Sequence, residues 1–190
     1  MRLEIANVKE FKEIIYPEYL HLFTEEERKS YYELEKAIFN NITTIIKIIV
    51  ESKIVGFMIL NILKDMDFIQ LDYLGILSKY QRKGYGSEAI KLLYENYKKY
   101  KGIFIEVEKE GLGKDKEENE IRKKRVKFYE KLGFYKLNFN IKICTVIYST
   151  YFLKFNNSNI SNKKIEKDVL NIYYAILDKK NIAEKVKIIN

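Results

Sequence analysis

The sequence of 190 residues contains one cysteine, one proline and no tryptophan. Cys144 alone cannot form a disulfide within the chain, which is typical of proteins in a reducing compartment. No apolar run approaches the roughly 18 residues that a membrane-spanning helix needs. The charged segment from Met1 to Glu4 does not resemble a signal peptide. We therefore expect a cytoplasmic protein with no membrane partner.

Metal-ligating residues are also scarce. The sequence contains one histidine, His21, and no group of His, Cys, Asp and Glu has the spacing of a metal site. His21 lies among apolar neighbours on an expected helix, where we interpret it as a packed or surface residue. Cys144 falls in an expected late strand without a partner that would activate it, so we interpret it as a buried structural thiol. We expect no metal.

The formal net charge is +8, but lysine is distributed along the whole chain together with glutamate. A nucleic-acid-binding protein usually gathers its basic residues in one block or stripe. Solvated helix faces account for the dispersed pattern. We therefore do not expect a nucleic-acid partner, although a positive field would attract an anionic cofactor.

Hydrophobic periodicity predicts a series of helices and strands. A helical pattern covers residues 8–40, interrupted near Pro17, and Thr24 with Glu27 matches the capping box of a second helix. The remaining expected helices cover residues 87–100 and 119–132, and a last helix carries Val169, Leu170, Tyr173, Ile176 and Leu177. The expected strands cover residues 3–5, 43–50, 54–62, 68–76, 102–108, 134–139 and 141–151.

This order of elements predicts an α/β fold with a mixed sheet covered by helices. The length and the 47% hydrophobic content fit one ordinary domain. A polar linker at residues 156–159 separates that domain, residues 1–155, from a C-terminal helical extension, residues 156–190. The apolar stripe of the extension would pack on the domain or at the interface of a homodimer.

The segment Gln81-Arg82-Lys83-Gly84-Tyr85-Gly86-Ser87 connects an expected strand to an expected helix. Two glycines remove side chains where backbone N–H groups would close on an anion, and the helix that follows presents its N-terminal donors. The spacing matches neither a Walker loop nor a dinucleotide-binding fingerprint. It predicts a phosphate-binding turn of another kind.

Two motifs resemble the GNAT superfamily of N-acetyltransferases. The pattern Gln81-x-x-Gly84-x-Gly86 is similar to the superfamily's pyrophosphate loop for acyl-CoA. Downstream, Val126-Lys127-Phe128-Tyr129-Glu130-Lys131-Leu132-Gly133-Phe134 resembles its "FYEKLGF" helix end. The resemblance covers roughly residues 43–148 and is specific at the two motifs.

The resemblance implies a mostly antiparallel central sheet that is splayed between residues 68–76 and 102–108, flanked by helices, with an extra C-terminal helix. It also implies that acetyl-CoA binds as co-substrate. The implied cofactor-binding residues on the strand and loop are Leu74, Gly75, Ile76, Gln81, Arg82, Lys83, Gly84, Tyr85, Gly86 and Ser87.

The helix before Tyr129 departs from the superfamily pattern. Many members carry a CoA-contacting Asn seven residues before the tyrosine, whereas this chain has Arg122 there and Asn119 one turn earlier. We assign Asn119 and Arg122 to cofactor contacts. A solvated basic face is the alternative for Arg122.

Acetyl transfer to an amine needs a base for the amine and an acid for the leaving thiolate. By resemblance, Tyr129 lies beside the CoA sulfur as the acid and also counts among the cofactor-binding residues. Glu106 and Glu108 are charged residues within an apolar strand and share one of its faces, which makes them candidate bases. Asp72 is a third candidate. These carboxylates could instead bind the positive charge of the acceptor, with a water chain as base.

The sequence therefore predicts an acetyl-CoA-dependent N-acetyltransferase that acts directly on a primary amine of an unknown small molecule or protein. The first alternative is a CoA-binding sensor or interaction module without catalysis. A nucleic-acid-binding protein is the second.

Overall fold

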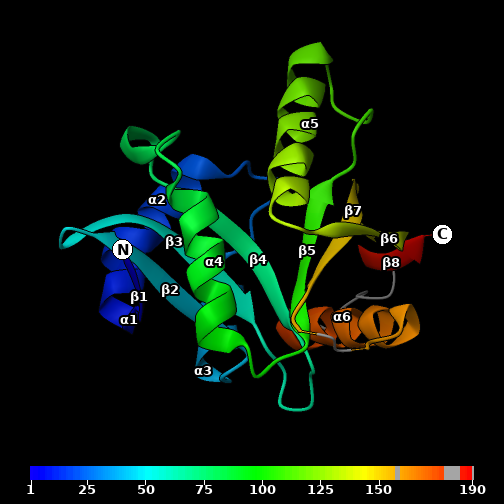
Figure 1. The fold of residues 1–190 in the computed structure, drawn as a ribbon, viewed down its shortest axis with the longest axis horizontal. Coiled ribbons are helices and arrows are strands. Elements are labelled where there is room, and N and C mark those ends of the chain that lie inside the picture. The colour runs from blue at the N-terminus through cyan, green and yellow to red at the C-terminus, as the bar shows by residue number, and fades with distance from the viewer. Residues whose placement is uncertain (157–158, 178–184, 190) are drawn as a thin grey trace. The chain divides into compact units, whose positions relative to one another are not determined.

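The chain folds into an α/β arrangement in which helices flank a mostly antiparallel sheet of eight strands (Figure 1). The computed structural model describes residues 1–156, 159–177 and 185–189. The strand order is β1-β2-β3-β4-β5-β7-β6-β8, with β4 and β5 parallel. The strands are β1 Arg2–Ile5, β2 Thr43–Val50, β3 Lys53–Asn61, β4 Ile69–Ile76, β5 Gly102–Glu108, β6 Tyr135–Ile143, β7 Val146–Lys154 and β8 Val186–Ile189.

The helices follow the expected order, and the fold class predicted from the sequence is confirmed. The helical segments are α1 Val8–Glu10, the π-helical η1 Phe11–Ile15, α2 Tyr16–Leu22, α3 Tyr31–Phe39, the 3-10 turn η2 Ser78–Tyr80, α4 Tyr85–Tyr97, α5 Lys116–Lys131 and α6 Asn162–Ile176.

The described chain forms two units that share strand β4. The first unit comprises Met1–Asp65 and Leu71–Lys99, and the second comprises Met66–Gln70 and the described residues from Tyr100 onward. The boundary between these units is not the domain boundary that we expect at residue 155. The expected domain boundary stays a prediction.

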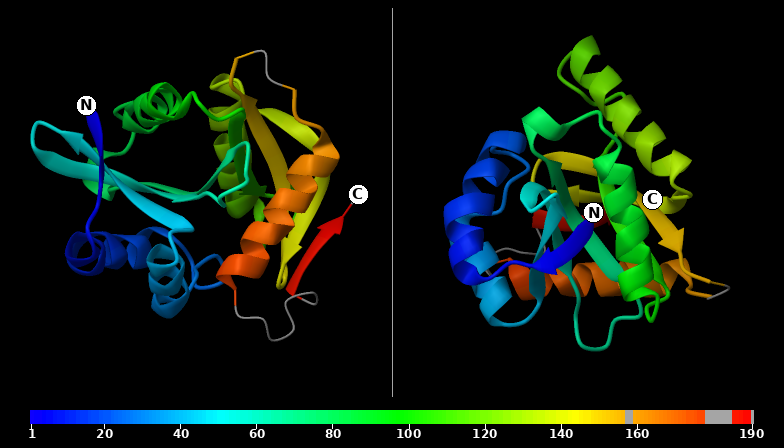
Figure 2. Two further views of the ribbon diagram at one scale, coloured as in Figure 1. Left: turned by 90° about the horizontal axis from the view of Figure 1, so that it is seen from below. Right: turned by 60° about the vertical axis from the view of Figure 1, so that its left-hand side comes forward.

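In the first unit, α4 lies on one side of the strands, and α1, α2 and α3 lie on the other (Figure 2). Phe11, Ile15 and Tyr19 from the N-terminal helical segments pack against Phe57 and Tyr73 of β3 and β4. Burial of this apolar surface, worth about 25 cal/mol for each Å², holds the helices on the sheet. The core therefore fixes the strand that leads into the glycine turn.

The start of α3 corrects one prediction. Ser30, and not Thr24, is the N-cap of this helix, because its side chain accepts from the Glu33 N–H while Glu33 reaches back to the Ser30 N–H. Glu27 does reach back as predicted, with the Thr24 N–H donating to its carboxylate at 3.0 Å. The Thr24 hydroxyl also donates to this carboxylate and does not cap a helix, and the two residues close a turn. The pairing of Thr24 with Glu27 thus stabilises a turn here and not the start of a helix.

In the second unit, β5 pairs with β7, β7 with β6, and β6 with β8, all antiparallel. Aromatic side chains fill its core, with Phe104 stacked on Phe139 at 6.4 Å between centroids and Phe68 edge-on to Phe152 at 6.0 Å. The extra C-terminal helix is present as α6. Its apolar stripe, including Val169 and Ile172, is buried within the single chain.

Two further details of this unit differ from the predictions. The β6–β7 turn lies at Cys144 and Thr145 instead of Asn140, where the strand continues through a register shift between Lys136 and Asn140. Strand β8 was not predicted. Residues 157–158 of the expected linker lie outside the described residues.

Candidate active site

The predicted phosphate-binding turn lies in the first unit, between β4 and α4. Gly84 is the N-cap of α4 and has a φ of 81°, a left-handed conformation that favours glycine. No side chain caps this helix. The N–H groups of its first turn, from Tyr85 to Ser87, therefore lack the internal partners that later turns have. Together with the positive end of the helix dipole, they suit an anionic group.

Open space and positive charge surround this turn. A Cβ atom on Gly84 would meet nothing within 4 Å, so its φ, and not crowding, requires glycine. Gln81, Arg82 and Lys83 are exposed, while the Gln81 amide donates to the Ile76 carbonyl at 3.0 Å and fixes the start of the turn. These features fit a phosphate group. Contact with CoA at these residues stays a prediction.

The three predicted strand residues, Leu74, Gly75 and Ile76, end β4. Crowding requires glycine at position 75, because a Cβ there would lie 2.7 Å from the Phe57 ring of β3. The approach is equally tight from Gly56, whose Cβ would lie 2.4 Å from the Gly75 carbonyl oxygen. The pair of glycines thus lets β3 and β4 approach closely, and main-chain contacts with CoA at these positions stay a prediction.

Tyr129 lies near the end of α5 in the second unit. Its half-buried ring packs edge-on against Phe128 and Phe134, at centroid distances of 5.0 and 5.3 Å. The N–H of Phe134 donates to the Tyr129 carbonyl at 3.2 Å, and Gly133 adopts the predicted left-handed conformation with φ 90°. The helix end therefore holds the tyrosine in place.

The Tyr129 hydroxyl is suited to donate a proton. Within the described part of the chain it makes no hydrogen bond. Burial raises the pKa of this hydroxyl to about 12, which outweighs the lowering effect of Arg125. The phenol keeps its proton at physiological pH, as an ordinary tyrosine does, and burial makes its ionisation still less favourable.

Glu106 is half-buried in β5, and both of its carboxylate oxygens accept hydrogen bonds. The Gln70 side-chain amide donates to Oε2 at 2.7 Å, and the Tyr173 hydroxyl of α6 donates to Oε1 at 2.6 Å. Gln70 is fully buried, and Tyr173 is 2% exposed. Donors from β4 and α6 thus hold this carboxylate of β5 in one orientation.

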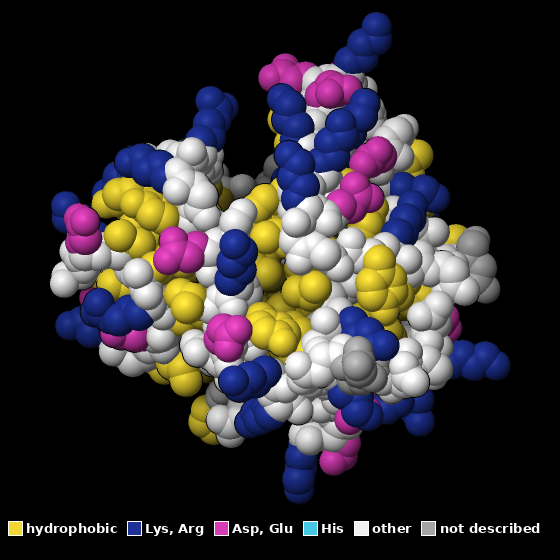
Figure 3. All heavy atoms as spheres, in the orientation of Figure 1, with side chains coloured by type: hydrophobic (Ala, Val, Ile, Leu, Met, Phe, Trp, Pro, Cys, Tyr) yellow, Lys and Arg dark blue, Asp and Glu magenta, His cyan; other side chains and the backbone are white. Residues whose placement is uncertain are grey.

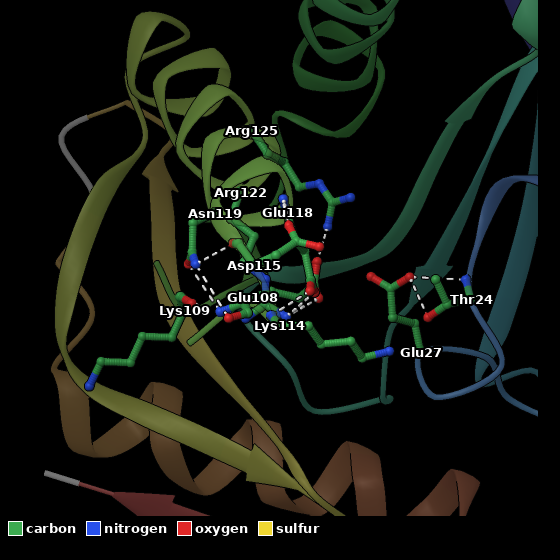
Figure 4. A network of polar contacts seen from close by, with 11 residues as sticks. Thr24, Glu27, Glu108, Lys109, Lys114, Asp115, Glu118, Asn119, Arg122 and Arg125 are labelled. Carbon is green, nitrogen blue, oxygen red and sulfur yellow. Dashed lines mark hydrogen bonds and ion pairs between the residues drawn. The ribbon is translucent and has the colours of Figure 1, made fainter. Parts of the chain in front are cut away.

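Glu108 belongs to a network of charges at the end of β5 (Figure 4). Arg122 contacts its Oε1 at 2.9 Å, and Arg125 contacts its Oε2 at 2.6 Å. Arg122 is 7% exposed and also bonds to Glu118 at 2.5 Å and to the Lys109 carbonyl at 3.1 Å. Both guanidinium groups therefore contact groups of the protein itself. From the sequence, a position on a solvated helix face had been the alternative for Arg122. Contact of Arg122 with CoA stays a prediction.

Asn119 organises the loop before α5. Its side chain accepts from the Gly113 N–H at 3.0 Å and donates to the Asp115 carbonyl at 2.7 Å, while Asp115 caps the helix (Figure 4). The amide therefore fixes the backbone of residues 113–115. Its assignment as a cofactor contact also stays a prediction.

The third candidate base, Asp72, lies in the first unit. Lys29 donates to both of its oxygens at 2.7 and 2.8 Å, and the Asn61 amide donates at 3.0 Å. The Lys29 and Asp72 side chains are 10% and 6% exposed. The Tyr73 hydroxyl donates to the Glu27 carbonyl at 2.6 Å, so the loop between α2 and α3 is tied to β4 at two points.

Lys29, Gln70 and Tyr173 were not among the predicted site residues. A lysine in a polar turn carries no signal for a buried partner, and Tyr173 was predicted only as part of an apolar stripe. Gln70 did carry a signal, because a polar amide within an otherwise apolar strand needs a hydrogen-bond partner.

The two residues that are single in their kind, Cys144 and His21, both lie on the surface. Cys144 is exposed in the turn between β6 and β7, so the interpretation as a buried thiol is wrong. His21 is exposed. In the residues that the structure describes, no group of His, Cys, Asp or Glu could hold a metal ion. No described helix is long and apolar enough to cross a membrane.

Basic side chains are spread over the surface seen in Figure 3, with some density along α5, where acidic side chains lie among them. The exposed lysines of α5 include Lys116, Lys123, Lys124, Lys127 and Lys131. This mixture is typical of a solvated helix face.

The sequence model of the GNAT acetyltransferase domain matches residues 42–136 of the 190-residue chain. A GNAT-family protein from Bacteroides thetaiotaomicron has 15% identity and a TM-score of 0.71, with 93% of this chain and 97% of that chain covered. A GNAT acetyltransferase from Elizabethkingia anophelis with acetyl-CoA bound has 13% identity and a TM-score of 0.59, covering 80% and 97%. A Bacillus subtilis acetyltransferase in complex with CoA has 12% identity and a TM-score of 0.58, covering 82% and 99%.

The comparison with curated protein sequences gave no match. At these identities the structural likeness establishes the fold, and the match of the domain model to half of the chain establishes the family. The chain therefore belongs to the GNAT family of acetyltransferase domains.

Proposed function

We propose that this protein is an acetyl-CoA-dependent N-acetyltransferase that transfers the acetyl group directly to a primary amine. The observation that carries the proposal is the turn at Gly84, where an uncapped helix N-terminus, open space and exposed basic side chains suit an anionic group. The matching structures from Elizabethkingia anophelis and Bacillus subtilis hold acetyl-CoA and CoA, respectively, on the same fold.

The proposed reaction is a single displacement at the thioester. The amine nitrogen attacks the thioester carbonyl carbon, so an N–C bond forms and the C–S bond breaks. The amine gives up one proton, and the leaving thiolate of CoA takes up one proton. The products are an N-acetylated amine and CoA with a free thiol, so atoms and charge balance.

Tyr129 is the proposed acid for this reaction. Its hydroxyl is neutral at physiological pH, as that of an ordinary tyrosine is, and burial raises its pKa further, to about 12. The phenol donates a hydrogen bond to the sulfur as negative charge develops there and can pass its proton to the leaving group, and a general acid of this kind contributes roughly 10²- to 10⁴-fold in rate.

Glu106 is the proposed acceptor carboxylate, which binds the amine and receives its proton directly or through water. Among the two strand carboxylates, Glu108 already engages two guanidinium groups. Glu106 accepts from a neutral amide and a neutral hydroxyl, among its partners, and its side chain is half-buried. An oriented carboxylate favours a cationic acceptor, such as a polyamine or another primary amine.

A screen for thiol release tests the proposal. Purified protein with acetyl-CoA is offered polyamines, amino acids, aminoglycosides and lysine peptides, and mass spectrometry identifies any acetylated product. We expect at least one amine to yield equal amounts of acetylated product and free CoA. Acetyl-CoA binding without turnover of any amine would support the inactive binding module instead.

A further inference from the structure

We propose that Tyr173, in the C-terminal helix α6, is a positioning residue that orients the acceptor carboxylate Glu106. The proposal rests on the proposed function, because it assigns a partner to the carboxylate that receives the amine. Under this proposal, the C-terminal extension contributes a residue to the part of the enzyme that binds the acceptor.

The contact is direct, and its donor is buried. The Tyr173 hydroxyl donates to Glu106 Oε1 at 2.6 Å, and Tyr173 is 2% exposed. The Gln70 amide donates to the other oxygen at 2.7 Å and lies 3.4 Å from the Tyr173 hydroxyl. A hydrogen bond between a neutral donor and a charged acceptor is stronger than one between neutral groups. The two donors together select one orientation of a long, flexible side chain.

The helix that carries Tyr173 is firmly anchored. Val169, Ile172 and Ile176 are each no more than 2% exposed, so the helix cannot rotate without exposing its apolar stripe. The Ser161 side chain caps the helix by accepting from the Lys164 N–H. Packing thus fixes the backbone at Tyr173, and the hydroxyl lies at a defined position.

The matched GNAT domain ends before this helix. Gln70 and Glu106 lie within residues 42–136, whereas Tyr173 lies beyond them. The part of the chain that follows the matched domain therefore supplies one of the two donors to a carboxylate inside that domain.

Misplacement of a reacting or substrate-binding group by about 1 Å can cost about 10²-fold in rate. Loss of the Tyr173 hydroxyl would remove the donor to Glu106 Oε1, and the carboxylate would sample more orientations. We expect the effect to fall on the amine and to spare acetyl-CoA, because the predicted CoA contacts do not include Glu106 or Tyr173.

A double-mutant cycle tests this role in the full chain with the amine identified by thiol release. Tyr173→Phe keeps the aromatic ring and removes only the hydroxyl. If Tyr173→Phe does not fold, Tyr173→Met takes its place in the cycle. We expect Tyr173→Phe to lower kcat/KM for the amine by about tenfold to hundredfold, the usual range for a hydrogen bond to a charged group. The KM for acetyl-CoA should not change.

Glu106→Gln supplies the second arm of the cycle. In that background, Tyr173→Phe should lower kcat/KM by less than about twofold, because the two side chains act as one unit. Tyr174→Phe is the matched control: this neighbouring tyrosine is 42% exposed, and its loss of a hydroxyl should leave all kinetic constants unchanged.

Equal effects of Tyr173→Phe in both backgrounds would overturn the positioning role, as would wild-type kinetics of the single variant. A parallel rise in the KM for acetyl-CoA would show a general structural effect and would also contradict it. A wild-type protein that acetylates no amine contradicts the proposed function itself, and the positioning role with it.

Discussion

Gly84 and Gly111 share one backbone conformation but differ in their predicted roles. Both have a φ of 81°, and a Cβ on either would meet nothing within 4 Å. A change to glutamate strains both positions equally, by about 1–2 kcal/mol, and adds the same charge. We expect Gly84→Glu to weaken CoA binding by more than about tenfold through like-charge repulsion at the anion site.

Gly111→Glu is the control for that change and should bind CoA as the wild type does. Calorimetric titration of CoA into each variant gives the comparison. Similar losses of affinity in the two variants would mean that strain or net charge, and not the turn at Gly84, controls binding.

Tyr129 gives a second prediction at this scale. Tyr129→Phe should lower kcat by about 10²-fold or more, because the leaving thiolate loses its proton donor. The free energy of unfolding should change little, since the hydroxyl makes no hydrogen bond within the described residues. Tyr135→Phe, at a 47% exposed position, is the control. Steady-state kinetics and urea unfolding measure the two effects, and an unchanged kcat would remove Tyr129 from the mechanism.

Charged residues inside the sheet were easier to recognise in the sequence than their partners. Glu106 and Glu108 stood out because charges inside an apolar strand need a reason. Their partners come from distant segments, namely Gln70, Tyr173 and the arginines of α5. Such contacts depend on tertiary packing, and no local spacing encodes them. The structure was therefore needed to show that the two carboxylates on this strand, Glu106 and Glu108, have different partners.

At the scale of elements, the start of α3 gives a prediction that separates two similar caps. Ser30 accepts from the Glu33 N–H and begins the helix, while Thr24 closes a turn. We expect Ser30→Ala to lower the free energy of unfolding by about 1 kcal/mol, the usual cost of losing an N-cap. Thr24→Ala should stay within about 0.5 kcal/mol of wild type. Urea unfolding compares them, and a larger loss for Thr24→Ala would contradict this assignment of the helix start.

Long periodic elements were predicted well, and β5 has the bounds expected from the sequence. The errors lie where local signals compete. A polar Asn140 indicated a turn, but strand pairing with β7 carries the chain past it through a register shift. Strand β8 has four residues and is held by its pairing with β6, so its own sequence gave little signal.

At the scale of the whole molecule, several tyrosines make stability depend on alkaline pH. Burial raises the pKa of Tyr129 and of Tyr151 to about 12, and it raises the pKa of Tyr19 further. An unfolded tyrosine ionises near pH 10, so between about pH 10 and 12 the unfolded chain loses protons that the folded chain keeps. The free energy of unfolding should therefore be fully maintained below pH 10 and fall as pH rises toward 12.

Urea unfolding at a series of pH values measures this dependence. Tyr129→Phe removes one of the contributing groups, so the decline above pH 10 should be shallower in that variant. A free energy of unfolding that stays level or rises over this range would contradict the assigned burial of these hydroxyl groups.

We propose above all that this GNAT domain binds acetyl-CoA at the turn between β4 and α4. The most direct measurement is native mass spectrometry of the purified full chain titrated with acetyl-CoA. We expect a one-to-one complex that is half-saturated below about 1 mM, the upper end of common KM values. Absence of any complex at millimolar acetyl-CoA would contradict the account.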